Sequence, residues 1–306
     1  MAGTSEILSL PEPVDDRRIR VFRRIFSLPG DIEEEMQVDA YVITGKRYVV
    51  VCDTLLCPQD AACIVQAVQA ELAGRQLLVF NSHADWDHCW GNSYFDGPEQ
   101  AYRAPIIAHD ACRARMISPA AQEELHHYQQ RNALFEHVVL TPPTMTFAHT
   151  LTIHDEEHTL TFFHAPGHTT DHSALWLPEL QILLAFDAVE RPFPLLENAE
   201  SVAAMFSTLE HFLALEPRIV LCAHGGVTDA ATIEENLAYM REIERRCRLF
   251  LTNRHIDDAE LANVSTLIAY PSTEALAGST TISDPAFYSQ AHEHNVRCVM
   301  RWLQGQ

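Results

Sequence analysis

The sequence is short of basic charge, and of lysine in particular. Its 306 residues include 42 Asp and Glu but only 21 Lys and Arg, so the formal net charge is −21, and Lys46 is the only lysine. A surface this acidic repels nucleic acid and anionic lipid. We therefore expect neither a polynucleotide nor a membrane as partner, and expect a small molecule as the substrate.

Paired cysteines, an export signal and long apolar runs are also missing. The eight cysteines are scattered without a C-x-x-C pair, and the opening residues MAGTSEILSLPEPVDD lack the basic start and apolar stretch of a signal peptide. No apolar run approaches the ~20 residues that a membrane span needs. These absences predict a cytoplasmic protein whose cysteines are reduced, mostly as small core residues.

Strand-like and helix-like segments alternate along the chain. The hydrophobic share of 47% is enough for a normal core. The turn at Gly45 and Lys46 predicts a β-hairpin, and two further strand pairs are expected within 151–167 and 172–187. Single strands are expected at 20–28, 75–82, 104–110 and 218–225, and helices at 58–74, 119–137, 198–217, 228–251 and 289–303. This alternation, with hairpins interspersed, predicts a layered α/β fold with mixed sheets.

The stretch NSHADWDHCWGN, residues 81–92, follows one of these strands and concentrates acid and imidazole groups. His83, Asp85, Asp87 and His88 fall within six positions. The aspartates could cap a following helix and the histidines could be ordinary surface residues, or the four could hold a metal ion. This stretch alone leaves the two interpretations about evenly balanced.

Other strand ends favour the metal site. Asp53 closes the strand at 47–54, His168 follows Pro166-Gly167, Asp187 closes the strand at 181–187, and His224 closes the strand at 218–225. The carboxyl ends of strands are where α/β sheets usually place their sites. So many strands ending in an acid or a histidine indicate that these groups meet at one edge.

In their order and type, these motifs resemble the metallo-β-lactamase superfamily. That family has an Asp after an early strand, then H-x-H-x-D-H, a His within P-G-H-T, an Asp, and a final His before Gly. The corresponding residues here are Asp53, HADWDH (83–88), APGHT (165–169), AFD (185–187) and CAHGG (222–226). The resemblance spans roughly 38–230 and implies an αββα four-layer sandwich with a dinuclear metal site at one edge. We expect one such domain over 1–306, with a core at about 20–230 and a mostly helical C-terminal extension at 231–306.

The resemblance also implies the ligand set. One ion would be held by His83, Asp85 and His168, the other by Asp87, His88 and His224. Asp187 would bridge the two ions, and Asp53 would fix the ligand loop by hydrogen bonds. The family pattern has His where this chain has Asp85, and a carboxylate shifts preference from zinc toward iron or manganese. We expect two divalent ions, with zinc first and iron or manganese as alternatives.

Two such ions about 3.5–4 Å apart can hold a bridging hydroxide at neutral pH. The predicted activity is therefore hydrolysis of an ester, thioester, lactone or phosphoester, with Asp87 passing a proton to the leaving group. True β-lactamase activity is disfavoured, because Lys46 lies in the wrong region to grip a substrate carboxylate. The alternatives are a di-iron oxidoreductase related to flavodiiron proteins, and a metal-poor binding module.

The remaining residues receive weaker predictions. We interpret His158 and His292 as surface residues and His172 as structural or as a support for the ligands. By the resemblance, residues 111–150 and 190–200 lie where family members place substrate-contacting loops, and Tyr128, Arg191 and Phe193 are candidates for substrate contact only by that location. The extension at 231–306 could cover the site or form a homodimer interface.

Overall fold

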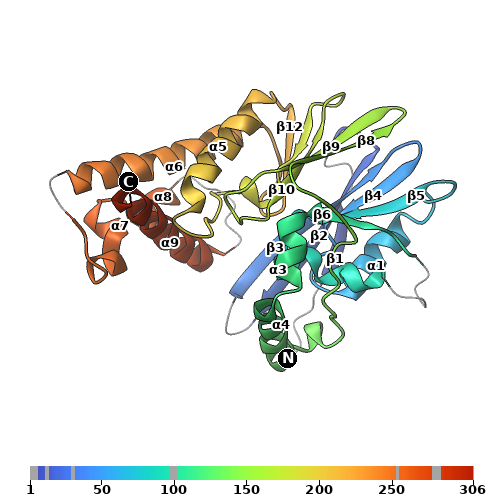
Figure 1. The fold of residues 1–306 in the computed structure, drawn as a ribbon, viewed down its shortest axis with the longest axis horizontal. Helices are drawn as coiled ribbons and strands as arrows, with labels where there is room; N and C mark the ends of the chain where they lie inside the picture. Colours follow the sequence, from blue (N-terminus) through green and yellow to red (C-terminus); the bar gives the residue numbers. More distant parts are fainter. Residues whose placement is uncertain are drawn as a thin grey trace.

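Two β-sheets form the middle of the molecule. The computed structural model describes residues 6–10, 14–28, 32–96, 102–252, 255–277 and 284–305. The first sheet has the order β1-β2-β3-β4-β5-β6-β7 and the second β13-β12-β11-β10-β9-β8. Figure 1 shows α1 and α3 on the side of the first sheet and α5 and α6 on the side of the second. This is the expected αββα layering.

The strands of the first sheet are β1 (Glu6–Leu10), β2 (Ile19–Leu28), β3 (Ile32–Thr44), β4 (Tyr48–Cys52), β5 (Gln76–Phe80), β6 (Ile106–His109) and β7 (Met145–Phe147). Those of the second are β8 (Thr150–Asp155), β9 (His158–His164), β10 (Ser173–Leu177), β11 (Ile182–Leu184), β12 (Ile219–Cys222) and β13 (Gly226–Thr228). The three predicted hairpins are confirmed, because β3–β4, β8–β9 and β10–β11 all pair antiparallel. Both sheets are mixed: β4 to β7 run parallel, as do β11 and β12.

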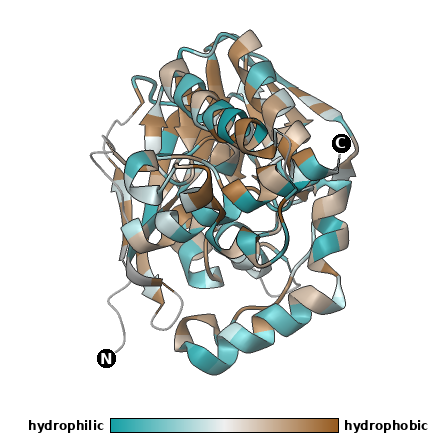
Figure 2. Ribbon diagram, turned by 90° about the vertical axis from the view of Figure 1, so that its left-hand side faces the viewer, coloured by the Kyte–Doolittle hydropathy of each residue, from teal (hydrophilic) through white to brown (hydrophobic). Residues whose placement is uncertain are grey.

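The α-helices are α1 (Pro58–Ala67), α2 (Trp86–Cys89), α3 (Asp110–Met116), α4 (Pro119–Arg131), α5 (Ser201–Ala214), α6 (Ala230–Leu251), α7 (Val264–Leu267), α8 (Ser272–Ala275) and α9 (Pro285–Gln304). Short 3-10 turns lie at η1 (Trp90–Tyr94), η2 (Ala133–Phe135), η3 (Phe186–Ala188) and η4 (Glu260–Asn263). The outer helices carry hydrophilic and hydrophobic residues in alternation, whereas the strands are mostly hydrophobic (Figure 2). No helix within the described ranges combines the length and apolarity needed to cross a bilayer.

Aromatic side chains fill the space between the two sheets. Phe80 of β5 packs against Phe162 of β9, with ring centroids 4.7 Å apart, and against Phe186, with centroids 5.9 Å apart. All three side chains are fully buried. Because Phe80 and Phe186 stand at strand ends, this packing brings the carboxyl-terminal edges of the two sheets together.

The C-terminal helices share a hydrophobic core with the second sheet. Met240 of α6 and Val299 of α9 belong to the same buried cluster as Met205 of α5 and Val220 of β12. Figure 1 shows α6, α7, α8 and α9 gathered on one side, with α5 next to them. The helical extension expected from the sequence is therefore present and packed against the sandwich.

Two predicted helices end well before the expected residue. The helix expected at 58–74 ends at Ala67, whose carbonyl accepts a hydrogen bond of 2.7 Å from Arg20, and turns follow. The helix expected at 119–137 ends at Arg131, because the side chain of Asn132 accepts from Leu134 N and begins η2. The helix that the aspartates of 81–92 could cap is only the single turn α2, which begins at Trp86.

The prediction that His158 and His292 lie on the surface is wrong. Their relative exposures are 5% and 0%. His292 Nε2 donates to the Tyr270 carbonyl at 2.7 Å, and Nδ1 accepts from the Tyr239 hydroxyl at 3.0 Å. Partners far apart in sequence satisfy both ring nitrogens, which permits burial of the imidazole.

Gly91 marks a close approach of backbones under the ligand loop. A Cβ there would lie 2.1 Å from the Thr54 carbonyl oxygen, and Thr54 N in turn bonds the His88 carbonyl at 2.7 Å. We expect Gly91→Ala to lower the free energy of unfolding by about 1–3 kcal/mol, the usual result of overpacking. Denaturant titration measures this. Gly305→Ala is the control, because its Cβ would meet atoms only at 3.6 Å; an equal loss in both variants would contradict the assigned clash.

Candidate metal centre

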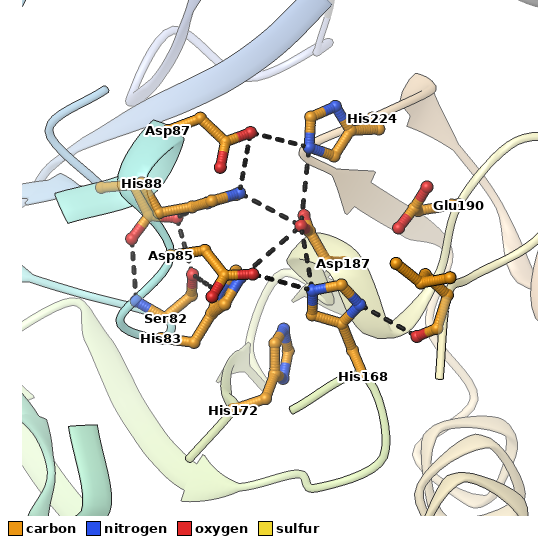
Figure 3. Close-up of polar contacts among 12 residues, drawn as sticks. Ser82, His83, Asp85, Asp87, His88, His168, His172, Asp187, Glu190 and His224 are labelled. Carbon is orange, nitrogen blue, oxygen red and sulfur yellow. Dashed lines mark hydrogen bonds and ion pairs between the residues drawn. The ribbon is translucent and has the colours of Figure 1, made fainter. Parts of the chain in front are cut away.

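The loops after five strands bring acid and imidazole side chains to one edge. Asp53 follows β4, the segment from Ser82 to His88 follows β5, His168 follows β9, Asp187 lies in η3 after β11, and His224 follows β12. All of these acid and imidazole side chains except Asp85 are buried, and Asp85 is 25% exposed. Figure 3 shows the imidazoles and carboxylates pointing toward one another across a common centre.

The carboxylate of Asp187 occupies that centre. Its Oδ2 lies 3.1 Å from Nε2 of His88, 3.5 Å from Nε2 of both His168 and His224, and 3.6 Å from Nε2 of His83. Four imidazoles from three different loops thus share one oxygen. Asp187 Oδ1 is also buried and has no hydrogen-bond partner in the described part of the chain.

The other two aspartates divide the imidazoles into two groups. Asp85 Oδ2 lies 3.3 Å from His83 Nε2 and 3.5 Å from His168 Nε2. Asp87 Oδ2 lies 3.3 Å from His224 Nε2 and 3.7 Å from His88 Nε2. The structure therefore brings together both predicted ligand groups, with Asp187 between them.

Each of the four imidazoles is oriented by a bond at its other nitrogen. His88 Nδ1 lies 2.9 Å from Asp53 Oδ2, and His83 Nδ1 lies 2.9 Å from the Ser82 hydroxyl. His168 Nδ1 lies 3.0 Å from the Leu195 carbonyl, and His224 Nδ1 lies 2.6 Å from the Gln37 carbonyl.

The partners of Nδ1 show which nitrogen of each imidazole carries a proton. Carboxylate and carbonyl oxygens only accept, and the Ser82 hydroxyl donates to Asp53 Oδ2 and so accepts from His83. The Nδ1 atoms therefore carry protons, so Nε2 is the atom of each ring that faces the centre and is left for a metal ion. No hydrogen bond of good geometry reaches the buried Nε2 of His83, His88 or His168 among the described residues. Neutral imidazole nitrogens and carboxylate oxygens aimed at one point are the donors that divalent transition metals take, so the residues present fit such ions.

The pKa shifts in the cluster also indicate a site that favours positive charge. Burial opposes protonation of His88, yet Asp187 and Asp87 raise its pKa well above the usual range. Burial likewise opposes protonation of His168, and Asp85 and Asp187 raise its pKa to about 9. For Asp187, burial is outweighed by His88 and His224, which hold its pKa well below the usual range. The carboxylates thus create a negative potential that favours positive charge at the centre.

Asp85, the departure from the family pattern, points into the site. Its Oδ2 faces His83 and His168, while its Oδ1 accepts from the Arg115 guanidinium on α3. Arg115 also donates to Asp171 Oδ1 at 3.1 Å, and Asp171 Oδ2 accepts from the Ala84 backbone N–H at 2.8 Å. One oxygen of Asp85 is therefore left for a metal ion, and the charge that Asp85 adds is paired.

Several neighbours of the centre carried no recognisable signal in the sequence. Arg115 and Asp171 belong to no motif, and only the tertiary contact reveals them. Glu190 lies close enough to His168 and Asp187 for one atom of each to share a cation. Its Oε2 accepts from the Tyr288 hydroxyl of α9 at 2.9 Å, and burial together with Asp187 raises its pKa to about 7. The position of Glu190, three residues after Asp187, is the one hint that the sequence offered.

The three residues suggested for substrate contact pack against other side chains, and none of them lines the cavity at the centre. Phe193 is 1% exposed and stacks on Tyr239 at 4.1 Å. Tyr128 packs against Trp86 at 5.3 Å, and the Arg191 guanidinium bonds the hydroxyl of Thr232 at 3.3 Å. His172 is fully buried and donates from Nδ1 to the Ala165 carbonyl at 3.1 Å, which is a structural role.

A cavity of about 170 Å³ opens onto the centre. Its polar lining consists of Asp85, Asp87, His168, Asp187, His224 and Glu190. Its apolar lining consists of Phe26, Ile32, Met36, Trp86, Leu195 and Phe287. Phe287 belongs to α9, so the C-terminal extension contributes to this cavity.

Comparison with known proteins agrees with the fold. A sequence model described as the metallo-β-lactamase superfamily matches residues 34–224. A metallo-β-lactamase family protein from Thermus thermophilus aligns with a TM-score of 0.63 at 16% identity, covering 93% of each chain. A metallo-β-lactamase from Pontibacter korlensis aligns with a TM-score of 0.59 at 15% identity, covering 78% of this chain and 99% of that one. Among curated proteins there is no significant match.

We expect Asp53→Asn to weaken binding of zinc about 10–100-fold, the usual effect of losing a ligand's supporting partner. The variant removes both the acceptor that orients His88 and one negative charge, and both changes disfavour a cation. Competition with a chromogenic chelator measures the affinity, and circular dichroism checks the fold. Asp155→Asn, which removes another buried carboxylate, serves as the control. Equal affinities in all three proteins would contradict the role given to Asp53.

We expect Asp85→His to raise the ratio of zinc to iron plus manganese in protein purified without added metal. Imidazole favours zinc relative to carboxylate oxygen. Arg115 would lose a carboxylate partner in this variant, so the double variant Asp85→His with Arg115→Met tests whether the unpaired guanidinium limits the effect. Elemental analysis gives the ratio. An unchanged metal content in both variants would show that the side chain at position 85 does not ligate.

Proposed function

Because the chain belongs to the metallo-β-lactamase superfamily, whose members are mostly hydrolases, we propose that it is a hydrolase working on a pair of divalent metal ions. The observation that carries this proposal is the convergence of four Nε2 atoms on Asp187 Oδ2, at 3.1–3.6 Å. Each imidazole is held in the tautomer that leaves Nε2 free to ligate. Such an arrangement serves no packing purpose that apolar residues would not serve better.

The distances from Asp85 and Asp87 to the histidine Nε2 atoms divide the proposed ligands into two groups. His83, Asp85 and His168 would hold one ion, and Asp87, His88 and His224 the other, with Asp187 reaching both. Zinc suits this set of nitrogen and oxygen donors, and the third carboxylate also admits iron or manganese. When bound, such ions supply an acidified water as nucleophile and a Lewis acid for the substrate oxygen.

The protein's own residues orient the ligands and exclude water. Asp53, Ser82 and the carbonyls of Gln37 and Leu195 keep the imidazoles from turning. The apolar walls of the cavity keep bulk water from the reacting bond. Asp87 lines the cavity and its Oδ2 lies 3.3 Å from His224 Nε2, so its carboxylate is placed to take a proton from the nucleophile and return it to the leaving group.

Metal content, and the dependence of activity on metal, test the proposal. We expect about two zinc ions per chain in protein supplied with zinc, ester hydrolysis that a chelator abolishes, and recovery when zinc is restored. We expect Asp187→Asn to lose both ions, while Asp155→Asn retains them. Two irons with an optical charge-transfer band and oxygen consumption would replace the hydrolase with an oxidoreductase. A folded protein that takes up no transition metal would leave only a binding role.

A further inference from the structure

Among the described residues, the walls of the cavity carry apolar side chains, acids and the two imidazoles of His168 and His224, but no ammonium or guanidinium group. Among the described residues that line it, none is Lys or Arg. Of the residues outside the described ranges, Arg254 alone is basic. The guanidinium of Arg115, which reaches Asp85, is already paired with Asp85 and Asp171. A negatively charged substrate would therefore find no free lysine or arginine side chain among the described lining residues.

Bound metal ions would supply only part of the missing positive charge. Asp85, Asp87, Asp187 and Glu190 line the cavity, and Asp87 and Asp187 alone, which no guanidinium of the described residues pairs with, would offset half of the charge of two divalent ions. The chain as a whole carries a formal charge of −21, which repels anions during approach. An anionic substrate would lose its hydration without compensation, and burying an unpaired charge is strongly unfavourable.

The apolar walls come from three separate parts of the fold. Phe26 and Met36 belong to β2 and β3, Trp86 is the first residue of α2, and Phe287 belongs to α9. Phe26 and Trp86 pack edge to face at 5.5 Å, which stiffens this wall. The cavity volume of about 170 Å³ is comparable to a cavity that binds benzene.

We propose that the substrate is an uncharged carboxylic ester or lactone whose apolar group, about the size of a benzene ring, fills this cavity. The inference rests on the proposed hydrolytic function and narrows it. Water adds its oxygen to the carbonyl carbon, and the bond from that carbon to the alkoxy oxygen breaks. One proton of the water passes to the alkoxy oxygen, and the carboxylic acid formed releases its own to solvent. Phosphoesters and carboxylate-bearing acyl groups are excluded by charge.

The test compares two esters that have the same leaving group and acyl groups of similar shape. These are p-nitrophenyl butyrate, which is neutral, and p-nitrophenyl hemisuccinate, which ends in a carboxylate. With the zinc-loaded protein, we expect kcat/KM to be at least about tenfold higher for the butyrate, as the cost of stripping water from an unpaired charge requires. We expect bis(p-nitrophenyl) phosphate to be slower than the butyrate as well.

A variant with a positive charge in the cavity wall provides a second measurement. We expect Phe287→Arg to lower the ratio of kcat/KM for the butyrate to kcat/KM for the hemisuccinate by about tenfold. The reason is that a guanidinium at that position would pair with the succinyl carboxylate. Leu249→Arg makes the same change of net charge on α6, at a side chain that is 69% exposed and does not line the cavity. We expect this control to leave the ratio of the two esters unchanged.

The outcomes distinguish failure of the proposed substrate class from failure of the proposed hydrolase function. Equal or faster hydrolysis of the hemisuccinate or of the phosphodiester would overturn the substrate class and keep the hydrolase. Absence of turnover with all three esters, in protein shown to hold two zinc ions, would overturn the hydrolase itself and the substrate class with it. The wild-type comparison decides the matter even if Phe287→Arg fails to fold.

Discussion

The organisation of this protein depends on one buried carboxylate that four imidazoles share. Asp187 Oδ2 lies within 3.6 Å of Nε2 on His83, His88, His168 and His224. Together with Asp85 and Asp87, it builds a negative potential in a region from which water is largely excluded. Such a cluster is stable only when positive charge is present. The requirement for positive charge at this point follows from the side chains alone, before any family resemblance is considered.

Holding that cluster in place requires both sheets. Phe80 and Phe186 pack across the interface between them, so the strand ends that carry the ligands cannot separate without opening the core. The supporting acceptors come from equally distant places: Asp53 follows β4, and the carbonyls of Gln37 and Leu195 belong to β3 and to the segment after η3. A ligand orientation set by so many elements is rigid, which is what a metal site with a defined geometry needs.

The departure at position 85 is compensated within the structure. A carboxylate in place of a histidine adds a negative charge, and Arg115 pairs with its outer oxygen while Asp171 holds the other side of the guanidinium. Asp171 also bonds the backbone of Ala84 inside the ligand loop. The substitution therefore belongs to a network of charges, and it leaves Asp85 Oδ2 facing His83 and His168. Because the Arg115 guanidinium is already paired with Asp85 and Asp171, it is not free to bind an anion.

The sequence predicted most of the elements and the candidate ligands, because both depend on local patterns. Strands and hairpins followed from β-branched runs and turns, and His83, Asp87, His168, Asp187 and His224 stood out because each follows an apolar strand. Tertiary structure alone decided the rest. The pairing of Asp85 with Arg115, the contact of Glu190 with Tyr288, the burial of His158 and His292, and the packing of Tyr128 and Phe193 away from the cavity all join residues far apart in sequence. No local pattern encodes such contacts, because they arise where separately specified elements meet in space.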